Sequence, residues 1–250
     1  MTDASLRGRK SPLTAIEIIV IICFSTAGAV VHGSLGLGAA LVAGPALVVI
    51  DPGFAPGPLI VIGQIVGFRH AFVERQHTDR QAVRHLVVGL PFGLAAGLAV
   101  LSAMSDKMLG ILIGSLAAAA AISLLCGLRI RRTSSVEMAT GFATAFTSIT
   151  AGLPGPPLVL TFSEMKPATL GGTFATFVLM VAAAGLIGLV VTGEFGRHEL
   201  ELTGWLAPGV VLGLAIARFV RPYVDRSWFR PAVLIVALAG GIALILRQLT

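Results

Sequence analysis

Charged residues are scarce in this chain of 250 residues, where Asp, Glu, Lys and Arg together make up only 12%. Ordinary soluble domains carry about 25% charged residues. Hydrophobic residues make up 56% of the sequence and its mean hydropathy is +0.93, so a water-soluble fold would have too few polar side chains to cover its surface. The composition therefore excludes an ordinary soluble protein and predicts an integral membrane protein.

Cysteine and the residue patterns of enzymes are also rare. The two cysteines, Cys23 and Cys126, lie far apart within apolar segments, which indicates neither a disulfide framework nor a metal site. The five histidines show no i, i+4 pairing on an apolar helix, and neither a nucleophile elbow nor a pair of intramembrane carboxylates is visible. We therefore expect no enzymatic activity, no cofactor and no metal.

The net charge of +6 does not require a nucleic-acid partner. Most Lys and Arg residues lie in short loops beside apolar segments, where the cytoplasmic loops of membrane proteins carry them. A basic patch with interleaved aromatic residues is absent from the sequence. We therefore expect the lipid bilayer, and no nucleic acid, as the partner of this chain.

Apolar segments of membrane-spanning length occur along most of the chain. A spanning helix needs about 20 apolar residues, and the stretches that reach or approach this length are 13–33, 56–73, 84–104, 107–128, 166–192, 199–217 and 229–249. Shorter apolar pieces lie at 36–50, 136–151 and 154–163. We predict an all-α membrane protein, a polytopic helical bundle of roughly 8 to 10 membrane segments with broken or re-entrant helices.

The two halves of the sequence resemble each other. Gly93 and Gly97 recur as Gly209 and Gly213, each 116 residues later, and the glycine-rich interruptions follow in the same order in both halves. Such duplications are common in secondary transporters. We interpret the chain as an N-terminal tail at 1–12, a first transmembrane repeat at 13–128, a basic linker at 129–135 and a second transmembrane repeat at 136–250.

Loop charge indicates how the two halves are oriented. The basic loops 74–84, 129–132 and 218–230 belong on the cytoplasmic side, whereas 193–201 carries three glutamates against one arginine. The acidic 193–201 loop corresponds to the basic 74–84 loop on the opposite face, which favours an inverted repeat of five elements each. A parallel four-plus-four arrangement is the alternative, since inversion places the basic N-terminal tail outside.

A glycine-rich run, HGSLGLGAALVAGP at 32–45, interrupts the first half. It lacks both the third glycine of a dinucleotide fingerprint and the Gly-Lys-Ser/Thr of a P-loop, which excludes nucleotide binding. Close packing of helices through small residues is one explanation. A helix break that faces a substrate is the other, because polar side chains such as His32 and Ser34 are costly at membrane depth unless they face a cavity or each other.

A second interruption, TSITAGLPGPP at 147–157, is its counterpart in the second half. Three prolines within four residues remove backbone donors, so a regular helix cannot continue. The exposed helix ends carry partial positive charge that suits an anion. We therefore predict that the breaks at 32–38 and 148–157 meet near the membrane centre. The predicted substrate-binding residues are His32, Ser34, Gly36, Gly38, Gln64, Ser148, Thr150, Gly152 and Gly155.

These short motifs together resemble the sulfite exporter TauE/SafE family. The residues that carry the likeness are Gly36, Gly38, Pro45, Gly93, Gly97, Gly152, Gly155, Pro156 and Pro157. Family members usually have consecutive glycines in the first break, whereas Leu37 separates the glycines here. The resemblance covers residues 15–248 and implies a multi-pass inner-membrane permease, a secondary transporter of sulfite, organosulfonates or related small sulfur-containing anions.

Alternatives stay open for single residues and for the function. Gln64 either lines a cavity or makes a helix contact. His32 is either a proton-coupling group, because histidine titrates near neutral pH, or a neutral histidine bonded to the backbone. A permease for another small anion such as a carboxylate, or a non-transporting membrane scaffold, has the same composition. The sequence also leaves the formation of a homo-oligomer open.

Overall fold

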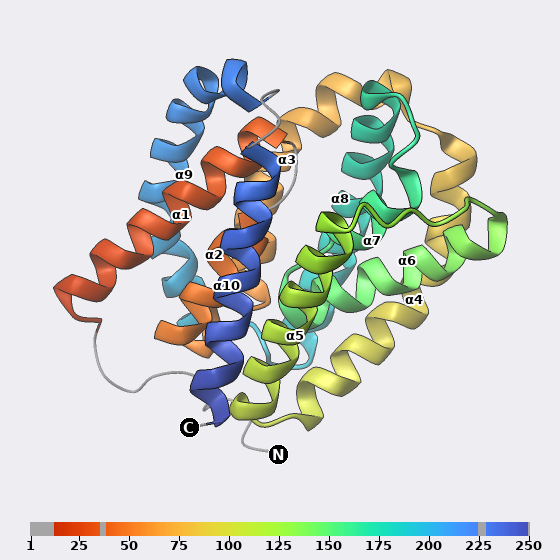
Figure 1. Ribbon diagram of the computed structural model, residues 1–250. Helices are drawn as coiled ribbons and strands as arrows, with labels where there is room; N and C mark the ends of the chain where they lie inside the picture. Colours follow the sequence, from red (N-terminus) through yellow and green to blue (C-terminus); the bar gives the residue numbers. More distant parts are fainter. Residues whose placement is uncertain (1–12, 36–38, 225–228, 250) are drawn as a thin grey trace.

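The computed structural model describes residues 13–35, 39–224 and 229–249 (Figure 1), with side chains except at 34–35, 66–75, 221–224 and 229–230. Every regular element in these ranges is helical. The elements are α1 (Ala15–Leu35), α2 (Ala39–Ile50), η2 (Pro52–Phe54), α3 (Gly57–Glu74), η3 (Arg75–His77), α4 (Arg80–Ala103), α5 (Asp106–Leu125), α6 (Ser134–Ala151), α7 (Gly155–Phe162), α8 (Pro167–Val191), α9 (Arg197–Val224) and α10 (Phe229–Leu249).

Six of the described helices are long and apolar enough to cross a membrane. They comprise residues 15–33, 80–103, 106–125, 167–191, 197–220 and 231–249. By contrast, α2 has 12 residues and α7 has 8, so each is shorter than the bilayer core, which a helix of about 20 residues spans. The prediction of an all-α, multi-pass membrane protein is confirmed.

Short polar side chains determine where three of the helices begin. Asp79, Ser105 and Thr133 each accept hydrogen bonds from backbone N–H groups two or three residues further on, at 3.0 to 3.4 Å. These N–H groups have no carbonyl partner inside the helix, and a side-chain oxygen at the N-cap satisfies them. The caps therefore position the first turns of α4, α5 and α6.

Glycines bring α4 and α6 into backbone contact. A Cβ built on Gly89 would overlap the carbonyl oxygen of Met138, and one built on Gly93 would overlap the carbonyl oxygen of Phe142. Gly97, one turn further, faces Ile149 at 3.0 Å. The contacts advance in the same direction along both helices, so α4 and α6 run parallel. Close approach through small residues is the usual way for membrane helices to associate.

A second parallel pair consists of α1 and α9. A Cβ on Gly209 would lie 2.6 Å from the carbonyl oxygen of Ile22, and one on Gly213 would lie 2.5 Å from that of Thr26. One turn on, Gly33 of α1 faces the side chain of Ala217 at 2.9 Å. In both pairs a glycine-bearing helix of one half of the chain packs against a helix of the other half.

The connections between helices gather at two ends of the bundle (Figure 1). At the acidic end, which comprises residues 51–56 and 192–201, Asp51 Oδ2 lies 3.0 Å from His198 Nε2. At the basic end, which comprises residues 75–84 and 126–133, backbone and side-chain bonds join the two segments to each other and to α7 and α8. The helix α9 begins at the acidic end and has 28 residues, so it extends about 42 Å.

The short helix α7 is enclosed by its neighbours. Its side chains Leu158 and Phe162 are buried in one apolar cluster with Leu86 of α4 and Phe177 of α8. This burial holds α7 inside the bundle, although it is too short to cross a membrane on its own.

Candidate functional site

The predicted break in the second half lies between α6 and α7. α6 ends at Ala151, and Gly152 follows in the left-handed conformation with φ of 68°. The Gly152 N–H donates to the Ser148 carbonyl at 2.8 Å, and the Leu153 N–H donates to the Thr147 carbonyl at 3.1 Å. The bond from the Gly152 N–H to the carbonyl four residues earlier is that of the αL motif, which favours glycine because it has no Cβ. The helix therefore stops through its own backbone chemistry.

Prolines then set the start of α7. Pro156 and Pro157 occupy its first turn, where a missing N–H costs nothing because helix N-termini leave those groups without an intrahelical partner. The break is shorter than the predicted 148–157, because residues up to Ala151 are still helical and α7 starts at Gly155.

Besides Gly152, three of the predicted site residues lie around this break. Ser148 and Thr150 are buried in the last turns of α6, and Gly155 is buried at the start of α7. The Thr150 hydroxyl donates to the carbonyl of Phe146 at 2.8 Å, within its own helix. In this conformation the Thr150 donor is therefore used locally.

The break approaches the first half of the chain through α3. A Cβ built on Gly152 would lie 3.0 Å from the Leu59 Cβ, and one built on Gly44 of α2 would lie 3.4 Å from a methyl group of the same leucine. Gln64, five residues along α3 from Leu59, is half-buried. Leu59 thus separates α2 from the break after α6.

The first predicted break is only partly described. His32 is half-buried near the end of α1 and interacts with a neighbouring group. Ser34 belongs to α1, but its side chain lies outside the described part, as do residues Gly36 and Gly38 entirely. Their role as ligands stays a prediction.

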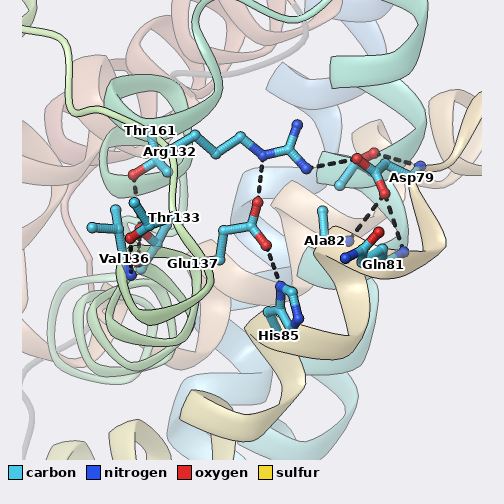
Figure 2. Close-up of polar contacts among 11 residues, drawn as sticks. Asp79, Gln81, Ala82, His85, Arg132, Thr133, Val136, Glu137 and Thr161 are labelled. Carbon is cyan, nitrogen blue, oxygen red and sulfur yellow. Dashed lines mark hydrogen bonds and ion pairs between the residues drawn. The ribbon is translucent and has the colours of Figure 1, made fainter.

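A network of charged side chains at the basic end was not predicted from the sequence (Figure 2). Arg132 Nη2 donates to Asp79 Oδ2 at 2.6 Å, and Arg132 Nε donates to Glu137 Oε1. The second oxygen of Glu137 lies 2.5 Å from His85 Nδ1. One guanidinium therefore joins the loop before α6 to the N-terminal turns of both α4 and α6.

The network also reaches α7 and α8. The guanidinium carbon of Arg132 lies 5.0 Å from the ring centre of Phe162, the last residue of α7. The Asp79 N–H donates to Thr173 Oγ1 at 2.9 Å, and the hydroxyls of Thr78 and Thr176 are 3.2 Å apart. Four helices are therefore tied together at this end of the bundle.

The charges of the network stabilise each other. Partial burial raises the pKa of Asp79, but hydrogen bonds from the Ala82 N–H and the Arg132 guanidinium outweigh it, so the pKa lies below its usual value of 3.8. Burial lowers the pKa of Arg132, but its bonds to Asp79 and Glu137 outweigh this effect and hold the pKa above the usual value for arginine. Both groups are charged at neutral pH.

Glu137 is the sequence signal that could have revealed this network. It is the one acidic residue in the apolar piece 136–151, and its side chain is only 5% exposed. A buried carboxylate requires a partner, and Arg132 lies five residues earlier. The sequence prediction considered Arg132 only as a loop charge that sets orientation.

A row of hydroxyls continues from Glu137 along α6. Thr140, Thr144 and Thr147 follow at intervals of three or four residues, so they share one face of the helix. The hydroxyls of Thr140 and Thr161 in α7 are 2.7 Å apart, and the Thr147 hydroxyl lies 2.8 Å from the carbonyl of Leu153 in the break. This polar face extends from the charged network to the break.

The family of the chain follows from comparison with known proteins. A sequence profile described as sulfite exporter TauE/SafE matches residues 20–244, nearly the whole chain. The chain belongs to the sulfite exporter TauE/SafE family. No curated protein and no solved structure matches it.

Membership in the TauE/SafE family explains the multi-pass fold, because this is a family of membrane transporters. The predicted family and the prediction of a membrane transport protein are confirmed. Within the described ranges, no group of three or more His, Cys, Asp or Glu residues is arranged to hold a metal ion.

The acidic end of this TauE/SafE protein has a carboxylate–histidine pair of its own. Asp51 is fully buried, and its Oδ1 accepts the N–H of Gly53 at 2.7 Å while Oδ2 faces His198. A small pocket adjoins this pair and is lined by Pro52, Gly53, Ala55, Pro56, Leu101, Leu109, Gly193, Glu194 and Glu199. The pair joins the end of α2 to the start of α9.

Proposed function

We propose that this protein is a secondary transporter that moves a small sulfur-containing anion, such as sulfite or an organosulfonate, across the cell inner membrane. The observation that carries the proposal is membership in a sulfite exporter family over residues 20–244. The break between α6 and α7 supports it, because interrupted helices inside a bundle leave backbone groups for a polar solute.

The packing supports two related repeats, α1–α5 and α6–α10. Gly209 of α9 packs on the carbonyl of Ile22 in α1, and Gly89 of α4 packs on the carbonyl of Met138 in α6. Ile22 and Met138 are 116 residues apart, and the two glycines are 120 residues apart. The contact of α1 with α9 therefore corresponds to the contact of α6 with α4.

The next turn repeats the same pair of spacings. Gly213 packs on the carbonyl of Thr26, and Gly93 packs on the carbonyl of Phe142. Comparison of the sequences alone aligned Gly93 with Gly209, whereas the helix contacts favour an alignment of Gly93 with Gly213. The difference is four residues, about one helical turn, so the glycine periodicity by itself does not determine the alignment.

Opposite orientation of the repeats accounts for the distribution of charge. α1 runs parallel to α9 and so begins at the acidic end, whereas α6 runs parallel to α4 and begins at the basic end. In a two-fold arrangement α3 would correspond to α8 and α5 to α10, and each of these helices does contact its counterpart. We place the basic end in the cytoplasm, because cytoplasmic loops carry the excess of Lys and Arg.

These relationships support the division into repeats at 13–128 and 136–250 with the linker 129–135 between them. The linker contains Arg132, so the residue that joins the repeats in sequence also holds the first turns of α4 and α6 together in space. Rocking of one repeat against the other would open the two ends alternately.

The proposed substrate site lies where the break after α6 approaches α2 and α3. Its ligands are backbone N–H groups of the breaks with the hydroxyls of Ser34, Ser148 and Thr150. For Thr150 this requires that its hydroxyl leave the Phe146 carbonyl when substrate binds. Hydroxyl and N–H donors suit an oxyanion whose charge is spread over several oxygens.

Reconstitution tests this proposal. Purified protein in liposomes is expected to accumulate labelled sulfite or a short sulfonate, and an excess of unlabelled sulfite is expected to compete. Preferential competition by a carboxylate or an inorganic anion would change the substrate assignment. Absence of flux for every anion in the panel, from protein with a normal thermal unfolding transition, would contradict transport.

The site assignment has its own test. Ser34→Ala and Thr150→Ala are each expected to lower the flux, because each removes a hydroxyl donor from the anion. Unchanged flux and unchanged half-saturation in both variants would remove these residues from the site without affecting the transport assignment.

A further inference from the structure

The helix α6 has two faces of different chemistry. On one face Gly141 and Ala145 pack against α4, where a Cβ on Gly141 would overlap the carbonyl of Leu86. The other face carries the hydroxyls of Thr140, Thr144 and Thr147. The first face permits no space between the helices, so α4 and α6 must move together.

Thr144 on the hydroxyl face has a side chain without a partner. It is fully buried, and its Oγ1 makes no hydrogen bond. The other three threonines of this helix are satisfied, since the hydroxyls of Thr140, Thr147 and Thr150 all donate to carbonyls one turn earlier. A buried hydroxyl without a partner is costly, and such exceptions in native structures require an explanation.

The first half of the chain provides an internal comparison. With the 116-residue spacing between α1 and α6, the residue that corresponds to Thr144 is Gly28. A Cβ on Gly28 would lie 2.9 Å from the carbonyl of Ala39 and 3.1 Å from the Ala43 side chain in α2. The α1–α2 contact is therefore close and apolar at the position that corresponds to the unsatisfied hydroxyl on α6.

We propose that the contact between α6 and α7, here called the α6–α7 seam (Thr140, Thr144, Thr147 and Thr161), is the route of the anion between the break at Gly152 and the basic end. This inference rests on the proposed transport function. In the described conformation the seam is closed, and the Thr140–Thr161 bond holds it. When α7 shifts away from α6, the Thr144 hydroxyl donates to an oxygen of the passing anion.

The surroundings of the seam fit a route for an oxyanion. At one end lies the break, where the Thr147 hydroxyl is within 2.8 Å of the Leu153 carbonyl. At the other end lies Arg132, whose guanidinium carbon is 5.0 Å from the ring centre of Phe162 in α7. A shift of α7 therefore changes the surroundings of Arg132, which also binds Asp79, the N-cap of α4. Arg132 provides positive charge at the mouth of the route.

Replacement of Thr144 tests whether its hydroxyl binds the anion or whether the side chain only fills space. Thr144→Val keeps the shape and removes only the hydroxyl, so it loses no hydrogen bond of the closed state and is expected to unfold at the same temperature or higher. Its flux is expected to fall at least about tenfold, because a donor to a charged oxygen is lost. Thr144→Ser retains a hydroxyl and is expected to retain most of the flux.

Thr203→Val is the matched control. Thr203 is also a buried threonine, but its hydroxyl donates to the Glu199 carbonyl within α9, outside the seam. Its flux is expected to equal that of the wild type. Equal flux and half-saturation in Thr144→Val and wild type would overturn the assignment of Thr144.

Cross-linking tests whether the seam opens. Cysteines in place of Thr140 and Thr161, in a Cys23→Ala, Cys126→Ala background, are expected to form a disulfide that stops transport, and a reductant is expected to restore it. The two single-cysteine variants are the controls. Wild-type flux in the fully cross-linked protein would overturn a moving α7.

Failure of the seam proposal can be distinguished from failure of the transport proposal. If the wild type moves anions but both seam tests give wild-type flux, the seam is wrong and transport stands. If the wild type moves none of the anions, transport fails, and labelling of Thr144→Cys by a water-soluble thiol reagent decides the seam. Labelling in the native protein supports an opening seam, and protection up to the unfolding temperature overturns it.

Discussion

Arg132 Nη2 donates to Asp79 Oδ2 at 2.6 Å, and through this bond the loop before α6 holds the first turn of α4. The same guanidinium donates to Glu137 at the start of α6. The two parallel helices that touch through glycines are thus also fastened at their N-terminal ends. Close glycine packing fixes the distance between the helices, and the ion pairs fix their register.

Arg132→Gln is expected to destabilise the protein by about 2 kcal/mol, because it leaves the buried carboxylate of Glu137 without its charged partner. Thermal or denaturant unfolding in detergent micelles measures the change. Arg129→Gln is the control, because Arg129 and Glu164 are 3.6 Å apart and both largely exposed. An exposed pair of this kind contributes about 0–1 kcal/mol, and an equal loss in both variants would contradict the importance of the network.

Asp79→Asn is expected to reveal how the network depends on pH. The pKa of Asp79 is lower in the folded protein, so its stabilising effect is complete above the unfolded pKa of about 3.9 and is lost as the pH falls through the folded pKa. Asparagine still caps a helix, so the variant removes mainly the charge. The difference in melting temperature from the wild type is expected to be constant between about pH 5 and 7 and to narrow below about pH 4. A difference that stays constant down to pH 3 would show that Asp79 acts only as a cap.

Gly152→Ala is expected to destabilise the protein by more than Gly127→Ala. Both glycines have positive φ, 68° and 64°, so both substitutions cost about 1 kcal/mol of backbone strain. A Cβ at Gly152 also lies 3.0 Å from the Leu59 Cβ, whereas nothing lies within 4 Å of one at Gly127. Unfolding free energies of the two variants isolate the contact between the break and α3, and equal losses would mean that Leu59 moves aside without cost.

Gly89→Ala is expected to prevent close packing of α4 and α6 and to destabilise the protein by at least about 2 kcal/mol, since a methyl group would overlap backbone rather than a flexible side chain. Gly204→Ala in α9 is the opposite control, because no atom lies within 4 Å of its built Cβ. That substitution is expected to stabilise the helix by about 0.5–1 kcal/mol. Destabilisation by both variants to the same extent would exclude the packing explanation.

Much of the membrane architecture was predictable because it follows from composition and length. The predicted segments at 107–128 and 166–192 became α5 and α8 with shifts of one to three residues, since a bilayer selects apolar runs of fixed length. The prolines after Gly152 predicted where α6 ends for an equally local reason. By contrast, 199–217 proved too short for α9, which extends to Arg197 and Val224, because arginine is a good helix former and does not stop a helix.

The candidate site was predictable only in part. Ser148, Gly152 and Gly155 do lie together at the break, where sequence placed them. The sequence could not show that the Thr150 hydroxyl is used within its own helix, because every buried threonine has that option and only the rotamer decides. Whether these residues bind an anion stays a prediction.

The sequence by itself determined that this chain is a helical membrane protein, that a helix ends near Gly152 and to which family the chain belongs. Those properties depend on hydropathy, proline chemistry and short motifs, all of which are local. Only the tertiary structure decided that Arg132 binds both Asp79 and Glu137, that α4 pairs with α6 as α9 pairs with α1, and that Thr144 lacks a partner. These features depend on which helix faces pack together across large sequence distances. A stripe of glycines or threonines indicates a close contact but does not determine which helix makes it.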